Sequence, residues 1–347
     1  MKKIIAFALC MLFCSYSNFS EAIGVKPEPP QLDEAYLLGV YAGSGKAFIL
    51  RESSGKLDIL RRYLDEDKDF SQSYIYPLQR EHYDLYTIKD ADTKAPSFGS
   101  DVSFERDKEG RGISARVDTS VYTRRYLNGE DGKPFRFKLE KKWSEIIAEA
   151  KAGVMPKQTA PNVARLVDLS TIVPSAHLDL RYTTHNNCFG NPLVNVKKAY
   201  LDKNAAQSLA KVSEKLKSFG YGLIIWEAYR PWSAFKLATV ALPRRSKSML
   251  PRLDKGYSHN TGMSIDVSLY TINDGKAVQM ICDFDVPTPA QYRKFIGGSS
   301  LERWERDLLG ELMSEEGFKP SDDEWWHFDY KADDKYQLLD IPLESLQ

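Results

Sequence analysis

The chain has 347 residues, and its 48 Lys and Arg balance 48 Asp and Glu, so the formal net charge is zero. At this length one hydrophobic core is unusual, and two domains are expected. The balanced charge argues against nucleic acid as a partner, since nucleic-acid-binding proteins carry a basic surface, and 42% hydrophobic residues is ordinary for a soluble globular protein.

Residues 1–22 have the pattern of a secretory signal peptide. Lys2 and Lys3 precede an apolar run over residues 4–13, and Ser20-Glu21-Ala22 is a small-x-small cleavage site. The apolar run is too short to span a bilayer comfortably, which makes an uncleaved anchor the weaker alternative. The pattern therefore predicts cleavage near Ala22, export to the periplasm or the outside of the cell, and a mature chain without a transmembrane segment.

Residues 35–140 are expected to form a small all-β accessory domain. Short strands are expected at residues 37–41, 47–51, 57–62, 83–88, 101–105 and 113–117, and the last two flank a turn at residues 107–112. Strands this short and closely spaced favour an antiparallel barrel or sandwich. The pattern leaves open whether this domain attaches to the cell wall, contacts a subunit or only stabilises the chain.

A lysine- and alanine-rich stretch over residues 141–164 contains Pro156 and Pro161 and is expected to be a helical linker. Residues 165–347 then alternate strands and helices. Asp202 is expected to cap a helix that runs to residue 219, an apolar run at 221–229 is typical of a strand covered on both faces, and another helix begins after Ser299. This half is therefore predicted to be an α+β catalytic domain, in which helices flank a small antiparallel sheet.

Polar and apolar residues alternate over residues 263–270, so a strand there presents Asp266 on the face opposite Ile265 and Val267. Gly262 allows the chain to turn just before this strand, because glycine adopts backbone conformations that other residues avoid. Such a turn would let His259 approach Asp266.

His327 and Glu324 lie in the run Glu324-Trp325-Trp326-His327-Phe328. Two imidazoles and one carboxylate are the ligand set of a catalytic zinc site, and Glu324 would then be free to act as a base. In a flat strand Glu324 and His327 face opposite ways, so this geometry requires a bend near Trp325. The alternative is a buried aromatic corner with His327 hydrogen-bonded in the core, and the residues alone leave both open.

The order of these motifs resembles that of the zinc D-alanyl-D-alanine dipeptidases of the vancomycin-resistance type, within the larger group of zinc D-Ala-D-Ala peptidases. Further stretches match in the same order, at residues 179–182 (Asp-Leu-Arg-Tyr), 187–192 (Asn-Cys-Phe-Gly-Asn-Pro) and 229–231 (Tyr-Arg-Pro). The resemblance covers residues 167–330 and leaves the β domain outside. It implies zinc-dependent hydrolysis of D-Ala-D-Ala, or of a related small D,D-dipeptide, in the metabolism of cell-wall peptidoglycan.

The resemblance also implies a role for each residue of the site. His259, Asp266 and His327 would bind one zinc ion, and Glu324 would be the general base for the zinc-bound water that acts as nucleophile. Arg230 would stabilise the carbonyl oxygen as it becomes negative. Without the resemblance, a structural salt bridge is the simpler interpretation of Arg230.

Asp285 and Ser258 are the substrate-binding residues that the resemblance implies. Asp285 would pair with the ammonium group of a free dipeptide, which a longer stem peptide lacks at that position. The alternative is a loop aspartate that faces water. Tyr257 stands where the family has a serine, and Ile281 and Cys282 replace small residues, so the preferred dipeptide stays open.

Two other functions are compatible with the sequence. The resembling D,D-carboxypeptidases act on intact stem peptides and usually have Glu-Pro-Trp-His where residues 324–327 read Glu-Trp-Trp-His. A non-catalytic wall-binding protein could keep the fold and the metal, but the retention of Glu324 and Arg230 argues against it. An exported dipeptidase fits the recycling of wall-derived dipeptide better than the depletion of a cytoplasmic precursor.

Cys188 and Cys282 would remain after cleavage of the signal peptide. In an oxidising compartment such a pair can form a disulfide, but the sequence does not tell how far apart the two residues lie. Two separate buried thiols are therefore an equal alternative. The oligomeric state is not indicated by the sequence.

Overall fold

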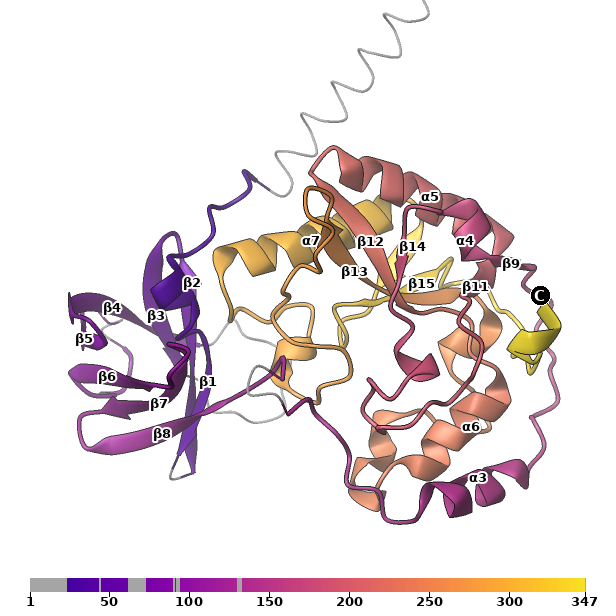
Figure 1. Ribbon diagram of the computed structural model, residues 1–347, viewed down its shortest axis with the longest axis horizontal. Coiled ribbons are helices and arrows are strands. Elements are labelled where there is room, and N and C mark those ends of the chain that lie inside the picture. The colour runs from indigo at the N-terminus through magenta and orange to yellow at the C-terminus, as the bar shows by residue number, and fades with distance from the viewer. Residues whose placement is uncertain are drawn as a thin grey trace, which may run out of the picture. The chain divides into compact units, whose positions relative to one another are not determined.

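The computed structural model describes residues 24–43, 45–61, 73–89, 91, 94–129 and 133–346, so the predicted signal peptide lies outside the described residues. The chain divides into two compact units (Figure 1). One comprises Met1–Tyr126 and Lys294–Glu311, and the other comprises Leu127–Arg293 and Leu312–Gln347. In the described part of the chain, no helix has the length and apolar character needed to cross a membrane. The domain boundaries expected at residues 140 and 164 stay a prediction.

The first unit contains a closed eight-stranded antiparallel barrel, so of the two expected architectures the barrel is present. Its strands are β1 (Gly39–Gly43), β2 (Lys46–Ser53), β3 (Lys56–Arg61), β4 (Tyr74–His82), β5 (Leu85–Ile88), β6 (Asp101–Arg106), β7 (Gly112–Val117) and β8 (Ser120–Arg125), preceded by the short helix α2 (Leu32–Ala35). Strand β1 pairs with β8 and closes the barrel, which removes the open sheet edges.

Aromatic side chains fill the interior of the barrel. The Tyr41 and Phe48 rings are stacked with 5.2 Å between their centroids, and Phe104 meets Tyr41 edge-on at 5.7 Å. The Tyr41 hydroxyl donates to the backbone oxygen of Leu37 at 2.7 Å, so the buried hydroxyl of this ring has a hydrogen-bond partner. A barrel of eight strands is just wide enough for such side chains, and its interior is a packed core.

Residues 294–311 belong to the same unit as the barrel, and the first residues of the helix in this segment are hydrogen-bonded to a barrel strand. Helix α7 (Ser300–Glu315) begins with the expected capping box, in which the Ser299 amide donates to Glu302 at 2.6 Å and the Glu302 amide donates to the Ser299 hydroxyl at 3.1 Å. The buried carboxylate of Glu52, on β2, accepts the Ser300 amide at 2.7 Å. The barrel therefore supplies a negative group at the helix N-terminus, where it is favourable.

The second unit is built on a five-stranded sheet in the order β10-β12-β13-β15-β14. The pairs β12–β13, β13–β15 and β15–β14 are antiparallel, and the edge strand β10 is parallel to β12. The bounds are β10 (His177–Leu178), β12 (Tyr221–Glu227), β13 (Ser264–Thr271), β14 (Phe318–Pro320) and β15 (His327–Tyr330), and a separate pair consists of β9 (Leu166–Asp168) and β11 (Tyr200–Asp202). Every residue of β12 is buried, in agreement with the prediction for residues 221–229.

Helices cover this sheet, and α5 packs against β12 while α3 packs beside α6 (Figure 1). The Asp202 carboxylate caps α5 by accepting the Asn204 amide at 2.8 Å, as expected, and Ala205 and Leu209 on its apolar face are fully buried. The helices are α3 (Trp143–Lys151), α4 (Leu169–Ile172), α5 (Lys203–Lys217) and α6 (Trp232–Ala241), with 3₁₀ turns η1 (Arg181–Thr183), η2 (Arg244–Met249), η3 (Ser258–Thr261), η4 (Pro289–Gln291) and η5 (Leu343–Leu346).

Cys188 and Cys282 are both buried, and each keeps its thiol. Of the two arrangements that the sequence left open, a disulfide or two separate buried thiols, the structure contains the separate thiols. No disulfide joins these two residues of the second unit.

Candidate metal centre

Three side-chain atoms converge in the core of the second unit. His259 Nε2 lies 3.2 Å from Asp266 Oδ1 and 3.1 Å from His327 Nδ1, and His327 Nδ1 lies 2.9 Å from Asp266 Oδ1. The ligand atoms of a tetrahedral zinc ion, each about 2.0–2.1 Å from the metal, lie about 3.3 Å apart. Among the described residues, this is the group of histidine, cysteine and carboxylate side chains that could hold a metal ion.

Strand pairing and one glycine bring these atoms together. Asp266 on β13 is the register partner of His327 on β15, so their side chains are neighbours on one face of the sheet. His259 comes from η3, which ends at Gly262 with a left-handed φ of 76°. The left-handed turn favours glycine, and a Cβ at this position would also push the Leu166 side chain aside, since it would lie 2.5 Å from it.

The expected bend before β15 is present. The His327 amide donates to the Glu324 carbonyl at 3.1 Å, which closes a turn through Trp325 and Trp326, and β15 begins only at His327. Glu324 is therefore not on the flat strand whose alternation would point it away from His327. Burial raises the pKa of Glu324 to about 7, with the nearby Asp266 carboxylate acting in the same direction. A carboxyl group with this pKa can both accept and donate a proton near neutral pH.

Outer hydrogen bonds orient both histidine rings. His259 Nδ1 lies 2.7 Å from the backbone oxygen of Ala228, which leaves Nε2 free as an acceptor. His327 Nε2 lies 3.1 Å from Asp329 Oδ1 and 3.3 Å from the Ser258 hydroxyl, which leaves Nδ1 for the cluster. Such partners fix the tautomer of a ligating histidine. Sequence reasoning missed Asp329, although a residue two positions after His327 on a strand shares its face.

Arg230 forms a buried ion pair. Its Nε lies 2.5 Å from Glu227 Oε1 and its Nη2 donates to Glu227 Oε2, and both side chains are buried. The guanidinium carbon also lies 4.6 Å from the centre of the Tyr182 ring. Arg230 thus makes the salt bridge that the residues alone favoured. Its Nη1 makes no hydrogen bond to a described residue, so this nitrogen of the guanidinium can still bind another group.

Asp285 is enclosed rather than facing water. Its Oδ2 accepts the Tyr182 hydroxyl and lies 3.6 Å from Cys188 Sγ. Burial raises the pKa of Asp285 to about 6, and the charges of Asp266 and Glu227 act in the same direction. Tyr182 therefore joins these two residues, since its ring contacts Arg230 and its hydroxyl binds Asp285.

Comparison with known proteins identifies the family. The profile of the Peptidase M15 family, described as D-ala-D-ala dipeptidase, matches residues 162–340. The D-alanyl-D-alanine dipeptidase of Enterococcus faecium is 32% identical over 178 residues, which are 46% of this chain and 88% of the relative. That of Escherichia coli K12 is 28% identical over 178 residues, 51% of this chain and 91% of the relative.

The chain belongs to the Peptidase M15 family. The resemblance seen in the motifs is thereby confirmed, and the chain is an enzyme of the metallopeptidase class. The segment matched to Peptidase M15 contains the convergent His259, Asp266 and His327 together with Glu324, while the barrel lies outside it.

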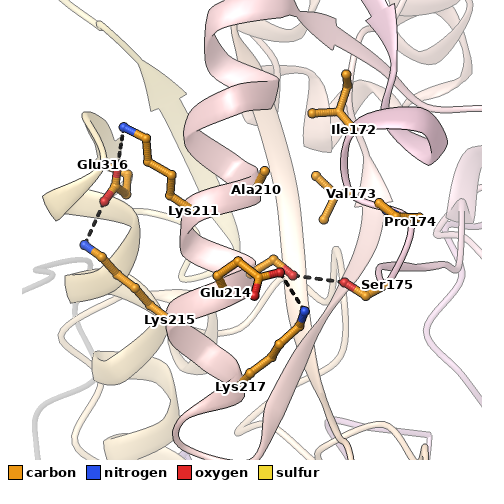
Figure 2. Close-up of a pocket in the computed structure, with 11 residues that line it drawn as sticks. Ile172, Val173, Pro174, Ser175, Ala210, Lys211, Glu214, Lys215, Lys217 and Glu316 are labelled. Carbon is orange, nitrogen blue, oxygen red and sulfur yellow. Dashed lines mark hydrogen bonds and ion pairs between the residues drawn. The ribbon is translucent and has the colours of Figure 1, made fainter. Parts of the chain in front are cut away.

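The Peptidase M15 domain also has a surface hollow that lies apart from these residues. It has a volume of about 510 Å³ and lies between α5 and residues 172–175, with an apolar floor that includes Ile172, Val173 and Ala210 (Figure 2). Its charged groups pair with one another, since Lys215 lies 2.7 Å from Glu316 and Lys217 lies 2.6 Å from Glu214. The described residues that line the hollow include no group of metal ligands, so the buried cluster of His259, Asp266 and His327 is the better candidate for the active site.

Replacing Asp329 with asparagine is expected to weaken zinc binding about 10- to 100-fold, because loss of an outer carboxylate frees the His327 ring and lowers its basicity. Competition with a chromogenic chelator would measure the zinc affinity of the full chain. Asp254→Asn, which changes an exposed aspartate paired with Arg252, is the matched control. Equal zinc affinity in Asp329→Asn and the unchanged protein would contradict this role.

Proposed function

We propose that the enzyme hydrolyses D-Ala-D-Ala, or a closely related D,D-dipeptide derived from peptidoglycan, with one zinc ion held by His259, Asp266 and His327. The observation that carries the proposal is the convergence of three ligand atoms at 2.9–3.2 Å, within the segment that matches the dipeptidase family. The ligand types also fit, since two imidazoles and a carboxylate leave a fourth position open, as catalytic zinc requires.

Residues around the cluster have different roles in the proposed hydrolysis. A zinc ion, when bound, acts as a Lewis acid and lowers the pKa of water toward neutrality. Glu324 accepts a proton from the attacking water and passes it to the leaving amine, as the carbon–oxygen bond forms and the carbon–nitrogen bond breaks. The free edge of the Arg230 guanidinium donates to the carbonyl oxygen while it carries negative charge.

Asp285 and Ser258 are the proposed substrate contacts. Oδ2 of Asp285 accepts the Tyr182 hydroxyl, and Oδ1 makes no hydrogen bond to a residue that the structure describes, so Oδ1 can accept from an ammonium group. A salt bridge of this kind favours a free dipeptide over a peptide whose amino group is blocked, because a buried carboxylate without a partner is costly. The Ser258 hydroxyl lies 3.3 Å from His327 Nε2, next to a proposed metal ligand.

Replacing Asp285 with asparagine is expected to lower kcat/KM for the free dipeptide about 10- to 100-fold, since it removes the charge and keeps the shape. It should also reduce the preference for D-Ala-D-Ala over its N-acetylated form. Release of D-Ala from both peptides measures the effect. Asp283→Asn, two positions away and paired with Arg181, is the control, and an unchanged preference in Asp285→Asn would contradict the ammonium contact.

Hydrolysis of three peptides by the zinc-loaded full chain tests the function itself. We expect release of D-Ala from D-Ala-D-Ala, and little from the N-acetylated dipeptide or from a stem pentapeptide. Comparable release from the pentapeptide would make the enzyme a D,D-carboxypeptidase. Binding of D-Ala-D-Ala without any release would favour the wall-binding alternative. From the signal pattern of residues 1–22 we infer that the reaction takes place outside the cytoplasm.

A further inference from the structure

Tyr257 is held rigidly against the candidate metal ligands. Its ring is stacked on His259, with 5.1 Å between the centroids and 25° between the planes, and it lies 6.0 Å from the His327 ring. On α6, Phe235 stacks on the same ring at 5.8 Å. The Tyr257 amide donates to Asn260 Oδ1 at 2.8 Å. With its backbone and ring both fixed, the side chain cannot turn away from the cluster without losing these contacts.

The same ring contacts Arg230. The guanidinium carbon lies 5.1 Å from the centre of the Tyr257 ring, a cation–π distance. Arg230 is in turn fixed by its bidentate pair with Glu227. Tyr257 therefore lies beside both groups that act on the scissile carbonyl in the proposed function, the metal cluster and Arg230.

The hydroxyl of Tyr257 has no protein partner among the described residues. The neighbouring Asn260 amide donates to the Tyr257 backbone oxygen at 2.9 Å, not to the phenol. Other tyrosines of this region are satisfied, since the Tyr182 hydroxyl binds Asp285 and the Tyr229 hydroxyl binds the Ile341 carbonyl at 3.1 Å. A half-buried phenol without a partner is poised to bind a ligand, and at neutral pH it is a proton donor.

We propose that Tyr257 is a further catalytic residue, whose hydroxyl donates a hydrogen bond to the oxygen that becomes negative at the scissile carbonyl, alongside Arg230. This inference rests on the proposed function. Sites that stabilise such an oxygen commonly combine several preorganised donors, and a donor held by packed rings costs no reorganisation during the reaction. No covalent bond to Tyr257 forms, and its proton stays on the phenol.

Tyr257→Phe removes the hydroxyl and keeps every ring contact. We expect kcat to fall about 100-fold with KM within about two-fold, because the lost hydrogen bond exists mainly in the transition state. A D-Ala-D-Ala analogue with a phosphinate in place of the peptide bond carries a tetrahedral anion, and calorimetry should show about the same loss in its affinity. Zinc content should stay at that of the unchanged full chain.

Tyr200→Phe is the matched control, because it removes a buried tyrosine hydroxyl on β11 that also has no hydrogen-bond partner among the described residues. Unchanged kcat and analogue affinity in Tyr257→Phe would overturn the inference and leave the ring with a packing role. A raised KM at unchanged kcat would also overturn it, since the hydroxyl would then contact the ground-state substrate, and loss of zinc would assign Tyr257 to ligand positioning. If the unchanged protein hydrolysed no dipeptide, the proposed function would fail and the inference with it.

Discussion

Replacing His259 with alanine is expected to abolish stable zinc binding and to lower dipeptide hydrolysis by more than about 10³-fold. The two remaining ligand side chains cannot hold a catalytic zinc ion, for which three protein ligands are usual. Loss of a metal ligand should also lower zinc affinity by more than the roughly 10- to 100-fold that is typical when a hydrogen-bond partner of a ligand is lost. Metal analysis after dialysis and release of D-Ala from D-Ala-D-Ala measure the two effects.

His177→Ala is the matched control for this experiment. His177 is exposed on β10 and stacks on Tyr270, so its loss removes an imidazole without touching the cluster. This control should keep one zinc ion per chain and full activity. A His259→Ala protein that still bound one zinc ion tightly would show that the metal is held elsewhere.

Replacing Glu324 with glutamine is expected to lower kcat about 10²- to 10⁴-fold while zinc stays bound, because an amide cannot accept the proton of the attacking water. The full-chain variant should therefore keep its zinc content in metal analysis and lose turnover in the D-Ala assay. In the unchanged enzyme, activity should rise with pH as Glu324 ionises, with the midpoint shifted below 7 when a metal cation is near. Activity near that of the unchanged enzyme in Glu324→Gln would exclude Glu324 as the base.

The same substitution should stabilise the metal-free protein. The folded pKa of Glu324, about 7, lies above its ordinary value of 4.5, so the folded state binds the proton more tightly than the unfolded state does. This contribution to stability is complete below the unfolded pKa and is lost as pH rises through 7. At pH 8 the free energy of unfolding of Glu324→Gln should exceed that of the unchanged protein by on the order of 1–3 kcal/mol, as thermal or urea unfolding would measure.

Glu316→Gln is the contrasting control for stability. Glu316 is paired with Lys215 and Lys211, and hydrogen bonds to these lysines outweigh burial and lower its pKa. Its contribution to stability is therefore present above the unfolded pKa and lost as pH falls, so neutralising it should not stabilise the protein at pH 8. Stabilisation of both variants at pH 8 would mean that a reduced overall negative charge, rather than the buried position of Glu324, is responsible.

Several elements could be predicted because their patterns are local. The cap of α5 at Asp202, the capping box of Ser299 and Glu302 and the apolar run of β12 each depend on neighbouring residues, and each is present. Strands β4 and β8 were missed because few of their side chains face inward. In β4 only Tyr76 and Leu78 are buried, and Pro77 separates them. Helix α6 was also missed, since only Ser233 of its residues is exposed and the helix lacks a clear polar face.

For the site, the sequence by itself determined the residue types and their order along the chain, and with them the family. It also allowed a turn at Gly262, and it required a bend near Trp325, because alternation along a flat strand would point Glu324 and His327 to opposite faces. Only the tertiary structure decided that three ligand atoms meet at 2.9–3.2 Å, that Glu227 binds Arg230, and that Asp329 orients His327. The meeting of the three atoms depends on strand register and on packing between distant segments, which no local pattern encodes. Glu227 and Asp329 lie within three positions of their partners, but the sequence does not tell which nearby side chain each of them binds.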